Sequence, residues 1–298
     1  MPHLSRMLRR IAVALWAGLL FVSPAAAWQV LEGPSVTPES GIWWTPAEPG
    51  RAIVIEVMEP DLLFAGLLLY SRDGSPTWYV VEARGSGATR TGALQAFTDG
   101  QTLDGAWRPN AFAGSPGVAS FTFESATAGW LELPGGRSRI ERYDVAMGFG
   151  GSAAPRERGA WWFNGTESGR GFFVETRGNI LFVLGTMYDE RGRAVWYAAQ
   201  GPMTTSTLFQ GALTRTAVGP PLPGDHLQPP HTAAIGTLTL SFNDPNTAAI
   251  TTPGGRQVPV VRYGLCREVQ RLVRIGAAAS QSVLPGFPWP GCGPFPND

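Results

Sequence analysis

The sequence predicts an all-β protein made of two tandem eight-stranded antiparallel up-and-down barrels. A domain-sized segment occurs twice, and each copy divides into short apolar runs separated by Gly, Pro, Asn and Asp. Neither copy contains a segment with sustained helical periodicity. Closing eight short strands into a barrel removes exposed sheet edges, and a pair of β-sandwiches is the alternative architecture.

Residues 1–27 have the organisation of a secretory signal peptide. Three arginines within the first ten residues precede the apolar run 11–22, which leads to three alanines at 25–27. A basic start, a short apolar core and a small-residue exit are the parts of such a signal, and the apolar run is too short to span a bilayer. We therefore expect export to the periplasm or the extracellular space, with no transmembrane segment in the mature chain.

One module occurs twice at a shift of 118 to 120 residues. After a segment at 28–39, the first copy spans 40–147 and the second 158–264, joined by a Gly/Ser/Ala-rich linker at 148–157. Repeats of about 20–50 residues build solenoids, so this longer repeat indicates duplicated domains. The matching segments are Gly41–Trp44 with Gly159–Trp162, Arg51–Glu56 with Arg170–Glu175, Phe64–Tyr70 with Phe182–Tyr188, Trp78–Tyr79 with Trp196–Tyr197, and Pro134–Arg137 with Pro253–Arg256.

Each copy contains eight candidate strands. Leu238, Leu240 and Phe242 alternate with polar residues, as in a half-buried strand. Asp73-Gly74 and Arg191-Gly192 predict tight hairpins between the third and fourth strands. In the second copy the predicted strands are Trp161–Phe163, Gly171–Thr176, Ile180–Tyr188, Ala194–Ala199, Leu208–Thr214, Ile235–Phe242, Ala248–Ile250 and Val258–Arg262.

Strands two to four of each copy are apolar on both faces. Leu62–Tyr70 and Ile180–Tyr188 show this most clearly. A strand that is apolar on both faces must be covered on both. We therefore expect the two barrels to pack on each other through these strands.

The repeated set Gly-x-Trp-Trp, Gly-Arg, Glu and Trp-Tyr resembles a repeat of exported proteobacterial proteins without assigned function, and this likeness covers both copies. Gly41 and Trp43, with Gly159 and Trp161, also resemble the opening of the calycin barrels, the lipocalins and avidins. In that family a tryptophan on the first strand plugs one end of an eight-stranded barrel. These resemblances imply an architecture and supply no catalytic residue.

The segment 265–298 predicts a short amphipathic helix followed by an irregular, Pro/Gly-rich tail. Apolar residues lie on one side of Leu265–Ile275 and arginines on another. Cys266 and Cys292 are the two cysteines of the chain. In an exported protein such a pair predicts a disulfide that holds down the tail.

Composition excludes several kinds of chemistry. All 23 basic residues are arginines, so a Schiff-base lysine or a phosphate-loop lysine is absent from the sequence. Removal of residues 1–27 leaves 20 arginines against 23 carboxylates. A mildly acidic chain without a basic cluster is not expected to bind nucleic acid. No dinucleotide, metalloprotease, esterase or calcium-loop motif occurs, and we expect no cofactor.

Aromatic residues give the strongest signal for ligand binding. Their flat faces suit sugar rings and apolar ligands, and packing inside or between the barrels is the alternative interpretation. With the repeated arginines, the candidate ligand-binding residues are Trp43, Trp44, Trp78, Tyr79, Trp161, Trp162, Trp196, Tyr197, Arg51 and Arg170.

Two sets of residues are candidates for catalysis. Glu56 and Glu175 recur in both copies and would act as acid/base groups facing a cavity, or else as structural carboxylates bonded to backbone or to an arginine on another strand. His226 and His231, with Asp225, lie in a proline-rich loop and would ligate a metal or form a proton relay, or else belong to an ordinary surface loop, which is the favoured interpretation. No metal site is expected.

These patterns favour an exported, non-catalytic binding or cell-envelope interaction protein, with a glycan as the most concrete ligand. A secreted hydrolase with a carboxylate or His226/His231 site between the barrels is one alternative. A lipocalin-like carrier of an apolar small molecule is another, and it would require a hollow barrel.

Overall fold

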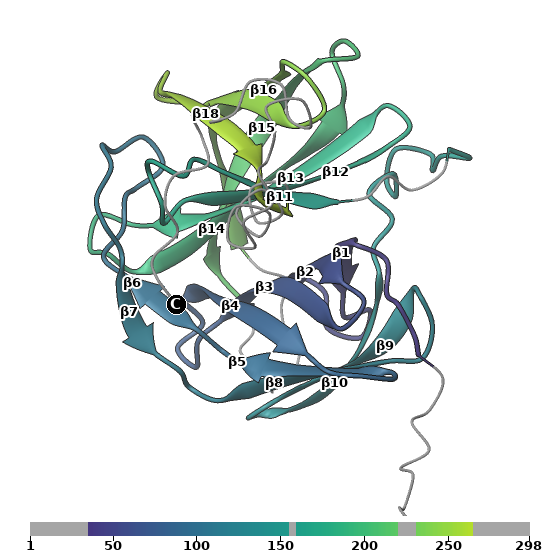
Figure 1. Ribbon diagram of the computed structural model, residues 1–298. Coiled ribbons are helices and arrows are strands. Elements are labelled where there is room, and N and C mark those ends of the chain that lie inside the picture. The colour runs from purple at the N-terminus through teal and green to yellow at the C-terminus, as the bar shows by residue number, and fades with distance from the viewer. Residues whose placement is uncertain (1–34, 155–158, 220–230, 265–298) are drawn as a thin grey trace, which may run out of the picture. The chain divides into compact units, whose positions relative to one another are not determined.

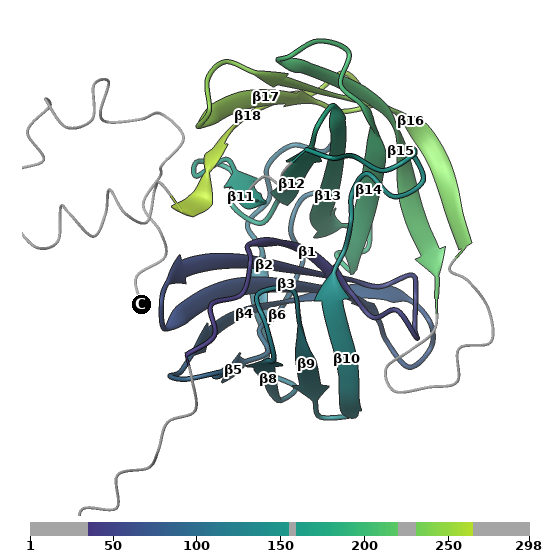
Figure 2. The ribbon, with the colours of Figure 1, turned by 90° about the vertical axis from the view of Figure 1, so that its right-hand side faces the viewer.

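The computed structural model describes residues 35–154, 159–219 and 231–264, and these residues fold into two closed eight-stranded antiparallel barrels (Figure 1). The predicted fold class is thereby confirmed. Figure 2 shows that the strands of each barrel curve around the axis of that barrel. No helix in the described ranges has the length and apolar character needed to cross a membrane.

The first barrel has the strand order β1-β10-β9-β8-β5-β4-β3-β2. The interruption in numbering arises because a separate two-stranded sheet, β6–β7, is inserted between β5 and β8. The strands are β1 (Gly41–Trp44), β2 (Ala52–Glu59), β3 (Leu62–Tyr70), β4 (Pro76–Arg84), β5 (Thr89–Ala93), β6 (Ala96–Thr98), β7 (Ala111–Gly114), β8 (Val118–Phe123), β9 (Ala128–Leu133) and β10 (Gly136–Arg142).

The second barrel runs in chain order from β11 to β18. All eight predicted strands occur, and β13 has the predicted bounds. The strands are β11 (Ala160–Phe163), β12 (Gly171–Arg177), β13 (Ile180–Tyr188), β14 (Ala194–Pro202), β15 (Leu208–Val218), β16 (His231–Phe242), β17 (Thr247–Thr251) and β18 (Gln257–Arg262).

The hairpin of β15 and β16 extends further than its sequence pattern indicates. The added residues are mostly Thr and Ala, whose weak apolar contrast hides the alternation that marks a strand. Register shifts at Leu213/Thr214 and Thr216/Val218 mark irregularities along it. In the first barrel the corresponding region is divided among β5, β6, β7 and β8, and the loop 99–110 joins β6 to β7.

Glycine permits the predicted turns between the third and fourth strands of each barrel. Gly74 and Gly192 have φ angles of 79° and 77°, in the left-handed region that favours glycine. The main-chain N–H of each donates to the carbonyl three residues earlier, on Ser71 and Asp189 respectively. Both turns therefore have the same geometry in the two copies.

The Gly-x-Trp-Trp match aligns Trp43 with Trp161, but the strand pairing of the two barrels differs from this alignment by one residue. Trp43 lies opposite Ile53 and Arg142, and Trp162 lies opposite Phe172 and Arg262. Trp43 is therefore equivalent to Trp162, not to Trp161. A shift of one residue reverses the face of a strand, so Trp43 and Trp162 belong to the barrel cores and Trp161 lies outside.

Apolar residues outside both barrels form a third buried cluster that contains residues from the two copies. It includes Leu68 of β3 and Trp161 of β11, with Trp78, Leu184 and Trp196. Leu68 and Thr186, on the outer faces of β3 and β13, are both buried. The low charge of the sequence matches these double-sided apolar strands.

Several predicted features lie outside the described residues. They are the signal peptide at 1–27, the helix at Leu265–Ile275 and the disulfide between Cys266 and Cys292.

A substitution on β3 tests the close contact at this third cluster. A Cβ atom added at Gly66 would lie 2.5 Å from Cζ2 of Trp161, whereas one added at Gly201 has no neighbour nearer than 3.8 Å. We expect Gly66→Ala to lower the free energy of unfolding by about 1–3 kcal/mol through overpacking, and Gly201→Ala to change it by about 0.5 kcal/mol or less. Chemical denaturation measures both; equal effects would contradict the contact.

Candidate functional site

The two candidate glutamates bind the first strand of the opposite barrel. The Glu56 carboxylate accepts a hydrogen bond from the main-chain N–H of Trp161 at 2.8 Å, and Glu175 accepts one from Ile42 at 2.6 Å. Both glutamates are buried. These contacts are those of a structural carboxylate.

Glu175 also forms a buried ion pair. Its Oε1 lies 2.6 Å from Nη2 of Arg142, and both side chains are 1% exposed. Arg142 additionally donates to the carbonyl of Ile42 and pairs with Glu39 at 3.3 Å. The carboxylate of Glu175 is therefore part of a buried polar network.

Most of the candidate aromatic residues are buried among protein groups. Trp43, Trp162 and Tyr197 belong to the barrel cores, and Tyr79 packs partly against the first core. The indole N–H of Trp78 donates to the carbonyl of Met187 at 3.0 Å. The indole N–H of Trp196 donates to the carbonyl of Leu69 at 3.2 Å. This is the equivalent bond, from the second copy to the first.

Trp44 is half-buried and packs edge-on against Tyr143, with ring centroids 5.6 Å apart. Trp161 packs against Phe64 and Phe173 in the same way. The candidate rings therefore contact other rings and main chain, and the structure does not bring them together as an open stacking surface.

The repeated arginines, in contrast, lie at one end of each barrel, which we call the mouth. Arg51 forms an ion pair with Glu48, and Arg170 pairs with Glu167 at 3.0 Å. Each arginine side chain is 1% exposed. Burial lowers the pKa of both guanidinium groups, and the carboxylates of Glu48 and Glu167 oppose that shift.

The mouth of the second barrel is filled by the loop 99–110 of the first copy. Leu103 is 5% exposed and belongs to the apolar core of the second barrel. Its carbonyl accepts a hydrogen bond from Nη1 of Arg170 at 2.9 Å. The amide of Gln101 donates to the carbonyls of Glu167 and Ser168, each at 3.1 Å.

Asp104 anchors the other side of this loop. Its carboxylate accepts hydrogen bonds from the hydroxyl of Thr252 and from the main-chain N–H of Gly254, the latter at 3.0 Å. Asp99, where the loop begins, has a φ angle of 66° and donates its N–H to Gly192. The side chain of Leu103, its carbonyl and the carboxylate of Asp104 are thus each bound by a different part of the mouth.

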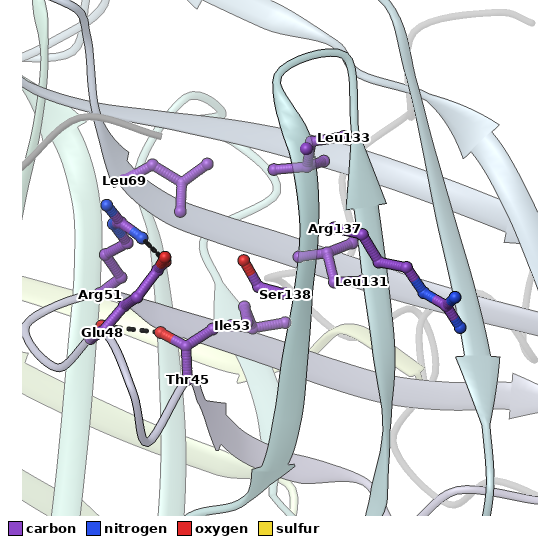
Figure 3. Close-up of a pocket in the computed structure, with 10 residues that line it drawn as sticks. Thr45, Glu48, Arg51, Ile53, Leu69, Leu131, Leu133, Arg137 and Ser138 are labelled. Atoms are coloured by element: carbon purple, nitrogen blue, oxygen red, sulfur yellow. Dashed lines mark hydrogen bonds and ion pairs between the residues drawn. The ribbon is translucent and has the colours of Figure 1, made fainter. Parts of the chain in front are cut away.

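The mouth of the first barrel contains a cavity of about 130 Å³ (Figure 3). Figure 3 shows Glu48 and Arg51 facing each other at one side, while the guanidinium of Arg137 points away. Arg137 instead lies over the ring of Trp130, 4.4 Å from its centroid. The lining residues are Thr45, Glu48, Arg51, Ile53, Leu69, Leu131, Leu133, Gly136, Arg137 and Ser138.

The histidine candidates lie at the edge of the described residues or outside them. His226 lies outside the described residues, as does Asp225, and His231 begins β16. In the described ranges no group of three or more His, Cys, Asp and Glu side chains could hold a metal ion.

Sequence reasoning identified the arginines and missed their partners. Glu48 and Glu167 precede Arg51 and Arg170 by three residues in both copies, which is a usable signal for an ion pair at a turn. Leu103 has no such signal, because nothing in a Gly-rich loop indicates that it inserts into another domain.

No family model, curated protein or solved structure matches the chain.

The buried ion pair predicts a large loss of stability when its charge is removed. Glu175→Gln retains an acceptor for Ile42 and leaves the charge of Arg142 without its nearest partner, so we expect the free energy of unfolding to fall by about 3–5 kcal/mol. Glu141→Gln is the matched control, because Glu141 pairs with Arg139 while both side chains are more than 40% exposed; an effect of about 0.5 kcal/mol or less is expected there. Urea titration measures both, and a small effect at Glu175 would refute its role.

Proposed function

We propose that the protein is an exported, non-catalytic binding protein whose ligand site is the mouth of the first barrel. The observation that carries this proposal is the comparison of the two mouths. The same repeated residues that enclose Leu103 in the second barrel line a cavity in the first. Export rests on the signal-like sequence of residues 1–27.

The cavity offers two kinds of contact. Ile53, Leu69 and Leu131 supply an apolar wall, and the Arg51–Glu48 ion pair supplies charge and hydrogen-bonding groups at the rim. A small apolar group attached to a polar or anionic group fits this combination, because ligand sites generally join an apolar lining to a few placed polar groups.

We further propose that the two barrels act as one rigid body. Reciprocal hydrogen bonds from Trp161 to Glu56 and from Ile42 to Glu175 support this, with those of the Trp78 and Trp196 indoles. A rigid body suits a binding protein, because a site that is already formed loses less conformational entropy when its ligand binds.

The alternatives receive less support from the side-chain contacts. A hydrolase acting through Glu56 or Glu175 would need those carboxylates to reach a substrate, whereas both are buried and bonded to main-chain N–H groups. A lipocalin-like carrier would need a hollow interior, whereas large side chains such as Phe121 and Phe209 occupy the two cores. Glycan stacking would need open aromatic faces, and most candidate rings are buried.

Methyl NMR tests the proposed site with small probes. We expect millimolar isovalerate or benzoate to shift the methyl resonances of Ile53, Leu69 and Leu131, because each probe joins an apolar group to a carboxylate. Ile250 is the internal control, since it is equivalent to Leu131 and lies in the mouth that Leu103 already fills. Equal shifts at both mouths, or none at either, would count against the proposal.

A further inference from the structure

The outer wall of the first barrel carries a tryptophan that the second copy lacks. Trp130 lies on β9 and Ala249 on β17, and each directly precedes an equivalent core residue, Leu131 and Ile250. The two positions therefore correspond, with a large ring in one barrel and a methyl group in the other. The aromatic candidates of the sequence come from the repeat, so Trp130 is not among them.

The charged neighbours of Trp130 are also absent from the second copy. In the first barrel Arg139 lies opposite Trp130, and Arg137 lies opposite Glu132. By the same strand pairing, the equivalents of Arg139, Arg137 and Glu132 in the second barrel are Pro259, Gln257 and Thr251. The second barrel closes without these groups, so closure of the first barrel does not require them.

Hydrogen bonds and ion pairs hold the Trp130 ring in place. Its indole N–H donates to Oε1 of Glu124 at 2.6 Å, and Oε2 of Glu124 lies 2.7 Å from Nη1 of Arg139. Arg139 also pairs with Glu141 at 3.2 Å. A ring that is already oriented loses little conformational entropy when a ligand binds to it.

Arg137 and Glu132 are the charged groups beside this ring that remain available to a ligand. Both are exposed, and in the described structure they form no ion pair with each other. The guanidinium of Arg137 lies over the Trp130 ring, 4.4 Å from its centroid, and points away from the mouth cavity (Figure 3). A cation–π contact at an exposed site is weak. A ligand can therefore replace the guanidinium on the ring and accept hydrogen bonds from it.

Hydroxyl groups extend this surface across β8 and β5. Thr122 and Thr89 continue the row of Trp130 across the strands. Ser120 and Thr91 continue the adjacent row, and in each row the two hydroxyl oxygens lie 3.3 Å apart. Neighbouring strands are about 4.8 Å apart, so four strands span about 14 Å. That length suits a short chain of sugars better than a single sugar.

We propose that Trp130, Arg137 and Glu132 form a second binding site, on the outer wall, for a neutral oligosaccharide. A pyranose whose substituents are all equatorial presents a flat C–H face to the tryptophan ring. Its hydroxyls accept hydrogen bonds from the guanidinium and donate them to the carboxylate. A polyanion fits poorly, because Glu124, Glu132 and Glu141 outnumber the arginines beside them. This site is separate from the mouth and does not depend on the function proposed there.

The experiment titrates the purified protein with cellohexaose, in which every glucose is all-equatorial. We expect the indole N–H resonance of Trp130, assigned from its loss in Trp130→Phe, to shift in NMR spectra. Calorimetry should show that Trp130→Ala weakens binding at least about tenfold, because truncating a tryptophan at the centre of a site usually has the largest effect. Trp107→Ala is the matched control, since Trp107 is 47% exposed on a loop, and its affinity should stay within about twofold.

Two further variants and a charged probe assign the contacts. Arg137→Met keeps an apolar stem beside the ring and removes the donors, so we expect affinity to fall about threefold to tenfold. Gln257→Met, at the equivalent place on the second barrel, should have no such effect. A hexamer of β-1,4-linked glucuronic acid, which adds a carboxylate to every sugar, should bind about threefold more weakly than cellohexaose.

Each outcome decides the inference. An unshifted Trp130 indole at millimolar cellohexaose overturns it, and so does an equal loss of affinity in Trp130→Ala and Trp107→Ala. Tighter binding of the glucuronate hexamer also overturns it, because the ligand is then an anion. Thermal denaturation checks that the variants are folded, and Trp130→Phe, which keeps a ring, should retain more affinity than Trp130→Ala.

The mouth of the first barrel is tested separately. Isovalerate should shift the methyl resonances of Ile53 and Leu69 in the Trp130→Ala variant as it does in the unaltered protein. Failure of the sugar site therefore leaves the proposed small-molecule site standing, and failure of the small-molecule site leaves the sugar site standing.

Discussion

Barrel closure depends on a carboxylate supplied by the other copy. The first strand of each barrel has four residues, and the last strand pairs with only two of them, Trp43 and Trp44 in the first barrel. The N–H of Ile42 precedes that pairing, and Glu175 accepts its hydrogen bond. Trp161 and Glu56 repeat the arrangement. A buried N–H without a partner would destabilise the barrel by about 1–3 kcal/mol, so each copy completes the hydrogen bonding of its twin.

This constraint explains why the apolar strands have two buried faces. A glutamate on the second strand can reach the first strand of the opposite barrel only if the second and third strands of both copies lie close by. Tryptophan suits this environment, because it buries a large apolar area while its N–H still needs an acceptor. Trp78 and Trp196 donate to main-chain carbonyls of the opposite third strand, so the polar requirement is met without adding charge.

The strands, the duplication and the barrel closure follow from the sequence, because alternation, turn glycines and a repeat are local patterns. The face of each first-strand tryptophan does not, since adjacent Trp residues match the repeat at either offset, and only pairing with Ile53 and Phe172 distinguishes them. The sequence marks Glu56 and Glu175 as repeated residues and is compatible with a catalytic or a structural role for both. Their contacts are long-range, with 105 and 133 residues separating donor from acceptor, and no local pattern encodes such a distance.

The two mouths show how the copies of a duplicated domain can differ in one region while their fold is retained. Burying a guanidinium is unfavourable unless its N–H groups find acceptors, and at each mouth a glutamate three residues earlier in the chain supplies one. Leu103 gives Arg170 a second acceptor, because its carbonyl lies beside the aliphatic side chain that enters the core of the second barrel. The exchange of Thr252 for Leu133 changes one side chain at the mouth of the first copy and leaves its arginine, its glutamate and its strands in place.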